Sequence, residues 1–322
     1  MRVIEAAEPG GPEVLRVAER PVPEPGEGQV LIRAVSAGVN GPDLKQRRGD
    51  YPPPPGASDL MGLEVSGEIA AVGAGVERWR EGDRVVALTN GGAYADYVAV
   101  DARHCLPVPE GVDPVDAGGL CETYFTVWSN LFHGHDVPAG ANVLIHGGSG
   151  GIGSTAVQLA AARDASVFAT CSAASAGFVT SLGAGRAIDY RSEDFVGILK
   201  EAGGADLILD FRGGANVERN FKAARMDCRI VQLAFDDGAR VEVNLGPVLM
   251  KRLVFTGSTL RPRSPEFKAA MARELEAEAW PLFARGTLRT VTHSVYPMER
   301  AAEAHAALEE GGHLGKILLS FA

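Results

Sequence analysis

The segment 143–153, VLIHGGSGGIG, constrains the fold of this 322-residue chain more than any other feature. It places a glycine at every third position, directly after a short apolar run and at the start of a helical pattern. Glycine permits a tight turn and a close backbone approach, and free N–H groups at a helix start favour phosphate. We therefore expect a strand–turn–helix that binds the pyrophosphate of a dinucleotide. The residues expected to contact it are Gly147, Gly150, Gly151, Ile152 and Gly153.

The chain after this turn alternates between short apolar runs and helical stretches. Five such runs occupy residues 166–170, 187–190, 205–211, 228–233 and 254–258. Alternating strands and helices at this spacing predict a parallel sheet covered on both faces, and six strands fit a doubly wound, Rossmann-type α/β fold. A P-loop is excluded, because no Gly-Lys-Ser/Thr follows the glycines.

The first third of the chain has a different pattern, with several short strands separated by glycine and proline. Segments 29–37, 82–88 and 93–100 resemble strands of a small β-barrel, and YPPPPG at 51–56 predicts a stiff loop. After residue 260 a long helix, a strand, a further helix and a last strand follow. We expect a first domain at 1–120, a dinucleotide domain at 121–260, and a return of 261–322 to the first domain, since short strands need partners.

Charge and apolar patterning exclude several classes of protein. The formal charge of −10 leaves no dominant basic face for nucleic acid or an anionic membrane. The N-terminus has no signal-peptide pattern, and no apolar run reaches the roughly 18 residues of a membrane span. The expectation is a soluble, cytoplasmic protein. The four cysteines are far apart without a C-x-x-C pair, so we expect free thiols.

The end of the predicted second strand bears on the choice of cofactor. An NAD site usually has Asp or Glu about 20 residues after the turn, whereas this chain has Thr170-Cys171-Ser172 there. Ser172 can donate to a 2′-phosphate, and Tyr190 with Arg191 can add an aromatic wall and a cation. These residues favour NADPH, with NADH possible. No Lys or Arg closely follows Ser172, and Arg212 is a hypothetical substitute for that cation.

Taken together, these motifs resemble the medium-chain dehydrogenase/reductase superfamily, in its zinc-independent quinone oxidoreductase branch, and within it the p53-inducible type. The resemblance runs end to end. Its motifs are GPEVL (11–15), AGVNGPDLKQRRGDYPPPPGASDLMGLEVSG (37–67), ETYFTVW (122–128), VLIHGGSGGIG (143–153), AIDYRSEDF (187–195) and LGKILL (314–319). It implies a GroES-like β-barrel catalytic domain beside the Rossmann-type domain.

The resemblance also implies that no metal is bound. Zinc-dependent members carry ligands at positions that match Asn40, Leu63 and Glu122, and leucine cannot ligate a metal. The four clustered cysteines of the structural zinc lobe are also missing between Asp96 and Asp116.

In related enzymes, residues matching Asn40, Tyr51 and Thr126 line the substrate and nicotinamide site. The resemblance makes Tyr51 a candidate proton source or anchor, or else a wall residue. Asn40 is a candidate contact to ribose or substrate oxygen, or else a turn-stabilising amide. Three residues after the fifth and sixth strands are expected near the nicotinamide by position alone: Leu233, Phe235 and Leu260.

Three functions remain open at this stage. The first is NADPH-dependent quinone reduction, the second is reduction of activated C=C bonds in enals or enones, and the third is a non-catalytic NADPH sensor. All imply a small-molecule partner and no nucleic acid or membrane. The apolar run 254–258 at a sheet edge, paired across a two-fold axis in relatives, predicts a homodimer.

Overall fold

The computed structural model describes residues 1–321, which form two units. Unit 1 contains Met1–Thr126 and the segment from Arg261 onward, and unit 2 is Val127–Leu260. The first division falls inside helix α3 (Cys121–Leu131), a few residues after the predicted boundary at 121. One helix therefore supplies residues to both units.

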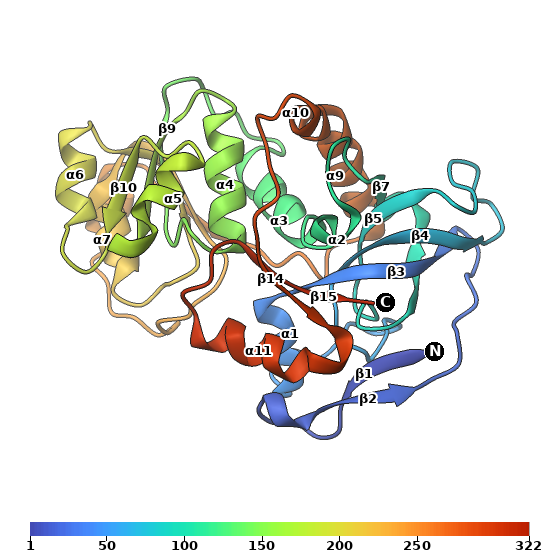
Figure 1. The fold of residues 1–322 in the computed structure, drawn as a ribbon. Coiled ribbons are helices and arrows are strands. Elements are labelled where there is room, and N and C mark those ends of the chain that lie inside the picture. The colour runs from blue at the N-terminus through green and yellow to red at the C-terminus, as the bar shows by residue number, and fades with distance from the viewer. Residues whose placement is uncertain (322) are drawn as a thin grey trace. The chain divides into compact units, whose positions relative to one another are not determined.

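Unit 2 is built on a six-stranded sheet in which every strand pair is parallel (Figure 1). The strand order is β10-β9-β8-β11-β12-β13, which is that of a doubly wound dinucleotide-binding sheet. The strands are β8 (Asn142–Ile145), β9 (Ser166–Cys171), β10 (Arg186–Asp189), β11 (Ala205–Asp210), β12 (Ala224–Gln232) and β13 (Val254–Gly257). The predicted Rossmann-type topology is confirmed.

Short helices connect these strands, as parallel pairing requires. They are α4 (Gly151–Ala161), η3 (Ala173–Ser175), α5 (Ala176–Ser181), α6 (Phe195–Glu201), α7 (Asn216–Ala223) and α8 (Gly246–Met250). Buried side chains of the central strands, such as Leu144 and Ile208, pack with Leu199 and Phe221 from the helices. Each contributes about 1.5–3 kcal/mol by leaving water.

Unit 1 contains a seven-stranded sheet of order β14-β15-β3-β4-β5-β7, with β6 also paired to β3. The strands are β3 (Gln29–Val39), β4 (Glu64–Val72), β5 (Arg84–Leu88), β6 (Tyr97–Asp101), β7 (Cys105–Pro107), β14 (Thr292–Pro297) and β15 (Lys316–Ser320); β1 (Arg2–Ala6) and β2 (Leu15–Glu19) pair separately. Because β15 runs antiparallel to β3, the C-terminal segment completes the sheet begun by the N-terminal one.

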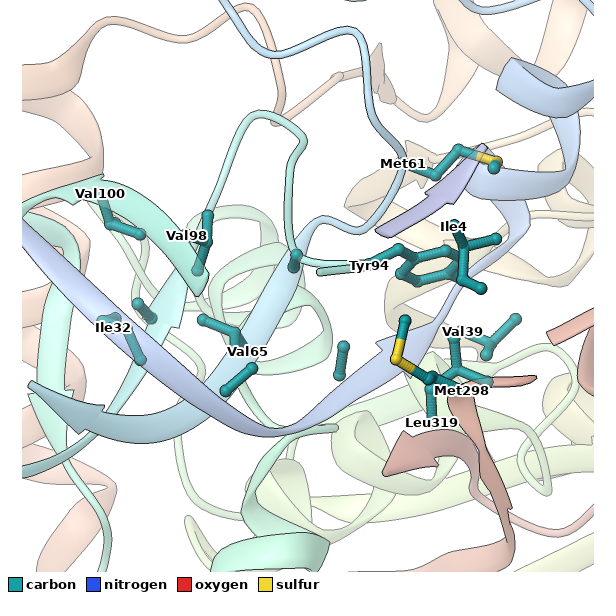
Figure 2. Packing of buried hydrophobic residues seen from close by; sticks show 14 of the residues in the cluster. Ile4, Ile32, Val39, Met61, Val65, Tyr94, Val98, Val100, Met298 and Leu319 are labelled. Carbon is teal, nitrogen blue, oxygen red and sulfur yellow. The ribbon is translucent and has the colours of Figure 1, made fainter. Parts of the chain in front are cut away.

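The helices of unit 1 lie before and after unit 2 in the sequence. They are η1 (Pro12–Val14), α1 (Gly41–Arg47), η2 (Ala102–His104), α2 (Pro114–Ala117), α9 (Pro265–Glu278), α10 (Trp280–Ala284), η4 (Met298–Arg300) and α11 (Ala301–Glu310). Figure 2 shows that the core joins both parts of the sequence, with Val39 of β3 near Met298 and Leu319. Within residues 1–321, no helix has both the length and the apolar character needed to span a membrane.

Candidate active site

The glycine-rich turn of unit 2 connects β8 to α4 and leaves no room for larger residues. Gly147 has φ +63°, and a Cβ there would lie 2.6 Å from the Phe211 ring. A Cβ on Gly153 would lie 2.1 Å from the carbonyl oxygen of Gly147. Gly150 caps α4 without a side chain, so the first N–H groups of the helix remain for an anion. This cradle fits the pyrophosphate of a nicotinamide dinucleotide.

A buried chain of hydrogen bonds fixes this turn in place. His146 Nε2 lies 2.8 Å from Asn220 Oδ1, and Asn220 Nδ2 donates to Asp210 Oδ2 at 2.8 Å. His146 Nδ1 lies 3.2 Å from the Thr170 hydroxyl, whose oxygen accepts the Gly147 N–H at 3.0 Å. Burial lowers the pKa of His146, which keeps the ring neutral. His146 thus orients the turn, as its position in the motif suggests.

The residues expected to choose between NADPH and NADH lie near the ends of β9 and β10. Ser172 Oγ is 2.9 Å from Ser175 Oγ, and Tyr190 is 55% exposed. The Arg191 guanidinium lies 5.6 Å from the centre of the Tyr190 ring. Arg212, by contrast, pairs with Asp237 at 2.5 Å and with Asp236 at 3.6 Å. Those two carboxylates offset the positive charge with which Arg212 would bind the 2′-phosphate.

The three residues predicted by position lie after their strands. The Leu233 N–H donates to Asp210 O at 2.8 Å, just beyond β12. Phe235 is exposed, and its ring lies close to Gly213: a Cβ added to Gly213 would be 2.7 Å from the Phe235 ring. Leu260 is half-buried and is the last residue of unit 2.

In unit 1, Asn40 belongs to a buried polar network. Its Nδ2 donates to Glu64 Oε1 at 2.9 Å and to Gly38 O at 3.2 Å, and its Oδ1 accepts from Lys316 Nζ at 2.5 Å. Lys316 also pairs with Glu64 Oε1 at 2.8 Å, and Glu64 Oε2 accepts the Glu122 N–H at 2.8 Å. Both N–H groups of the Asn40 amide are therefore used inside unit 1.

This donor set does not fit a zinc ion. Leu63 is buried and apolar, and the Asn40 oxygen already accepts a hydrogen bond from an ammonium group. A second cation there would be repelled by Lys316. Among residues 1–321, no cluster of three or more His, Cys, Asp or Glu side chains could hold a metal.

Tyr51 lies next to a buried cation. The Arg261 Cζ atom is 5.3 Å from the centre of the Tyr51 ring, and Arg261 Nη1 is 3.4 Å from the Tyr51 carbonyl oxygen. Burial and then Glu122 raise the pKa of the Tyr51 phenol, while Arg261 lowers it. Across the described chain, the phenol hydroxyl forms no hydrogen bond with protein. It can therefore donate to a substrate oxygen.

Two basic residues that sequence reasoning missed bind Asn90, and one of them, Arg261, also contacts Tyr51. Arg261 Nε and Nη2 donate to the Asn90 carbonyl at 3.0 and 2.7 Å, and Lys268 Nζ donates to Asn90 Oδ1 at 2.6 Å. Arg261 is 5% exposed and Lys268 1%. Burial lowers the pKa of Lys268 to about 8, which Glu122 opposes. The sequence feature that could have indicated Lys268 is its position on the apolar side of α9, near Ala269 and Met271.

Helix α3 places Glu122 one turn before Thr126, on the same face of the helix. Both side chains are half-buried. Burial, and then the neighbouring Glu64, raise the pKa of Glu122 to about 8. The site in unit 1 therefore combines a phenol, a carboxylic acid and two buried cations.

Comparisons with known proteins agree with this fold. The family "Zinc-binding dehydrogenase" matches residues 182–319, and "Alcohol dehydrogenase GroES-like domain" matches 26–110. The quinone oxidoreductase of Rattus norvegicus is 31% identical over 99% of this chain and 97% of its own. A solved Escherichia coli quinone oxidoreductase complexed with NADPH and a solved NAD-dependent alcohol dehydrogenase are each 29% identical. Both structures have a TM-score of 0.88 and cover 100% of both chains.

The fold and the nucleotide turn define a two-domain oxidoreductase that uses a nicotinamide dinucleotide. The chain belongs to the medium-chain dehydrogenase/reductase superfamily, in its quinone oxidoreductase branch. The predicted family, the GroES-like and Rossmann-type fold class and the NAD(P)H-dependent enzyme class are confirmed.

Proposed function

We propose that this enzyme reduces quinones with a hydride from NADPH and without a metal. The observation that carries the proposal is the Tyr51 hydroxyl, which has no hydrogen-bond partner among residues 1–321. The Arg261 guanidinium lies beside its ring, and Glu122 and Arg261 shift the pKa of the phenol in opposite directions. A quinone accepts hydride readily because conjugation stabilises its oxyanion, so a hydrogen bond can replace a Lewis acid. The names of the relatives, and the NADPH in the Escherichia coli structure, support the same proposal.

We assign the following roles to the residues of this chain. The glycine turn and the α4 N-terminus hold the pyrophosphate, and Ser172 with Tyr190 and Arg191 favours the 2′-phosphate of NADPH. Leu233, Phe235 and Leu260 of unit 2 border the nicotinamide. When bound, the reduced cofactor supplies the hydride. Tyr51 holds the substrate oxygen, and Asn40 acts mainly through Lys316 and Glu64, which it holds in place.

Cofactor absorbance with purified enzyme tests this function. NADPH and NADH are compared, each with an ortho-quinone, a para-quinone and an enone, in the presence of a metal chelator. We expect turnover with NADPH and a quinone, and a Tyr51→Phe enzyme with about ten- to a hundredfold lower kcat/KM but unchanged NADPH affinity, since one hydrogen bond to a developing charge is lost. Tyr97→Phe, in strand β6, is the matched control.

Other outcomes would redirect the assignment. Oxidation of NADPH only with the enone would move it to reduction of activated C=C bonds. NADPH binding without turnover of any acceptor would favour a sensor.

We further propose that a second copy of this chain pairs along β13. This strand is the last of its sheet, all four of its residues are exposed, and they include Val254 and Phe255. An exposed apolar edge strand is usually covered. We expect a homodimer by light scattering, and a shift toward monomer in Val254→Lys, which places a charge on that edge. A monomeric wild-type protein would contradict the proposal.

A further inference from the structure

We propose that Glu122 delivers the proton that completes substrate reduction, a role that rests on the proposed quinone reductase function. Hydride addition to a quinone gives a hydroquinone monoanion, which needs one proton. The O–H bond of the Glu122 carboxyl group breaks, a new O–H bond forms on the hydroquinone oxygen, and water later reprotonates the carboxylate. The hydride comes from NADPH, which is oxidised to NADP⁺, so atoms and electrons balance.

The position of Glu122 supports this role. Its backbone N–H is fixed by Glu64, and its side chain lies on the same face of α3 as Thr126. Within residues 1–321, the carboxyl group takes part in neither a hydrogen bond nor an ion pair. Because the residue is half-buried, the group keeps some access to water, which reprotonation requires. A carboxyl group that only stabilised the fold would be expected to have a partner.

The surroundings of Glu122 keep it protonated at neutral pH. Burial is the largest effect on its pKa, and Glu64 and Asp43 add to it, while Lys316 and Lys268 oppose it; the result is a pKa of about 8. The titratable and charged groups that face it are Asp43, Tyr51, Glu64, Cys121, Arg261, Lys268 and Lys316. Burial and nearby carboxylates therefore outweigh the two ammonium groups.

Glu122 and Tyr51 differ in acid strength, and this difference suits them to different roles. A phenol such as hydroquinone has a pKa of about 10, so a carboxylic acid with a pKa of about 8 gives up its proton downhill. The pKa of the Tyr51 phenol is raised above its ordinary value of 10.0. Proton transfer from Tyr51 would therefore run uphill. Tyr51 is suited to hold the substrate oxygen, and Glu122 to protonate it.

The test compares wild type with Glu122→Gln, which keeps the shape and removes the acid. We expect kcat with NADPH and a para-quinone to fall by about 100-fold or more, as for loss of a general acid, while NADPH affinity stays the same. Wild-type kcat should decline above pH 8 as Glu122 ionises, and this decline should be absent in the variant. Glu122→Asp should restore part of the rate. Glu110→Gln, at an exposed site, is the control.

Stability gives a readout that does not depend on turnover. The folded-state pKa of Glu122, about 8, is raised above its ordinary value of 4.5, so its contribution to stability is present below pH 4.5 and lost as the pH rises to 8. Wild type should therefore lose stability relative to Glu122→Gln across this range. If the stabilities of wild type and Glu122→Gln changed in parallel with pH, Glu122 would be an ordinary carboxylate and the proposal would be wrong. If Glu122→Gln had the kcat and pH profile of wild type, the role of Glu122 as proton donor would be wrong, but the proposed function would stand. If wild type turned over no acceptor, both the proposed function and the role of Glu122 would be wrong.

Discussion

Gly153→Ala is expected to lower NADPH affinity at least about 100-fold and to reduce the free energy of unfolding by about 2–3 kcal/mol. The added Cβ would lie 2.1 Å from Gly147 O and 2.8 Å from Gly148 Cα, and both are backbone atoms that cannot rotate away. The turn must open to relieve this overlap. Opening it removes backbone N–H donors from the pyrophosphate, and losing two hydrogen bonds to a charged group is enough for a 100-fold change. Titration calorimetry and chemical denaturation measure the two effects.

Gly177→Ala is the matched control for this substitution. Gly177 lies in α5 of the same unit, and a Cβ there would meet no atom within 4 Å. Replacing glycine by alanine in a helix stabilises by up to about 1 kcal/mol, so this variant should bind NADPH normally. Equal NADPH affinities for Gly153→Ala and Gly177→Ala would mean that the turn does not hold the cofactor.

The sequence was sufficient to predict unit 2 because the information there is local. The glycine spacing around Gly147 and Gly153, the preceding strand and the following helix lie within one short segment. Parallel strands joined by helices then restrict the sheet to few topologies. The structure has the strand order expected of a dinucleotide-binding sheet.

The site in unit 1 could be predicted only in part, because its contacts join distant parts of the chain. Asn40 and Lys316 are 276 positions apart, and their hydrogen bond exists because β15 pairs with β3. Lys268 and Asn90 are likewise 178 positions apart. The resemblance to a family indicated Asn40 and Tyr51, but no spacing rule pairs a lysine with a carboxylate across such distances. The partners of Asn40 therefore had to come from the structure.

Lys316→Met is expected to lower the free energy of unfolding by about 3–5 kcal/mol, because it leaves a buried carboxylate without its cation. Glu64 is 0% exposed, and Lys316 Nζ lies 2.8 Å from its Oε1. Asn40 Oδ1 loses a hydrogen bond at the same time. Chemical denaturation at pH 7 measures the loss. Lys222→Met, which removes an exposed lysine paired with Glu218 one helical turn away, should cost less than about 1 kcal/mol.

A double variant separates the buried charge from lost packing. Adding Glu64→Gln to Lys316→Met removes the uncompensated carboxylate, and the amide oxygen can still accept one of the two hydrogen bonds that Glu64 accepts from Asn40 Nδ2 and the Glu122 N–H. If the ion pair is the cause, the double variant should be more stable than Lys316→Met alone, with a coupling energy of about 0.5–3 kcal/mol. Additive losses would mean that Lys316 stabilises unit 1 through its alkyl chain, and that the charge on Glu64 is tolerated without a partner.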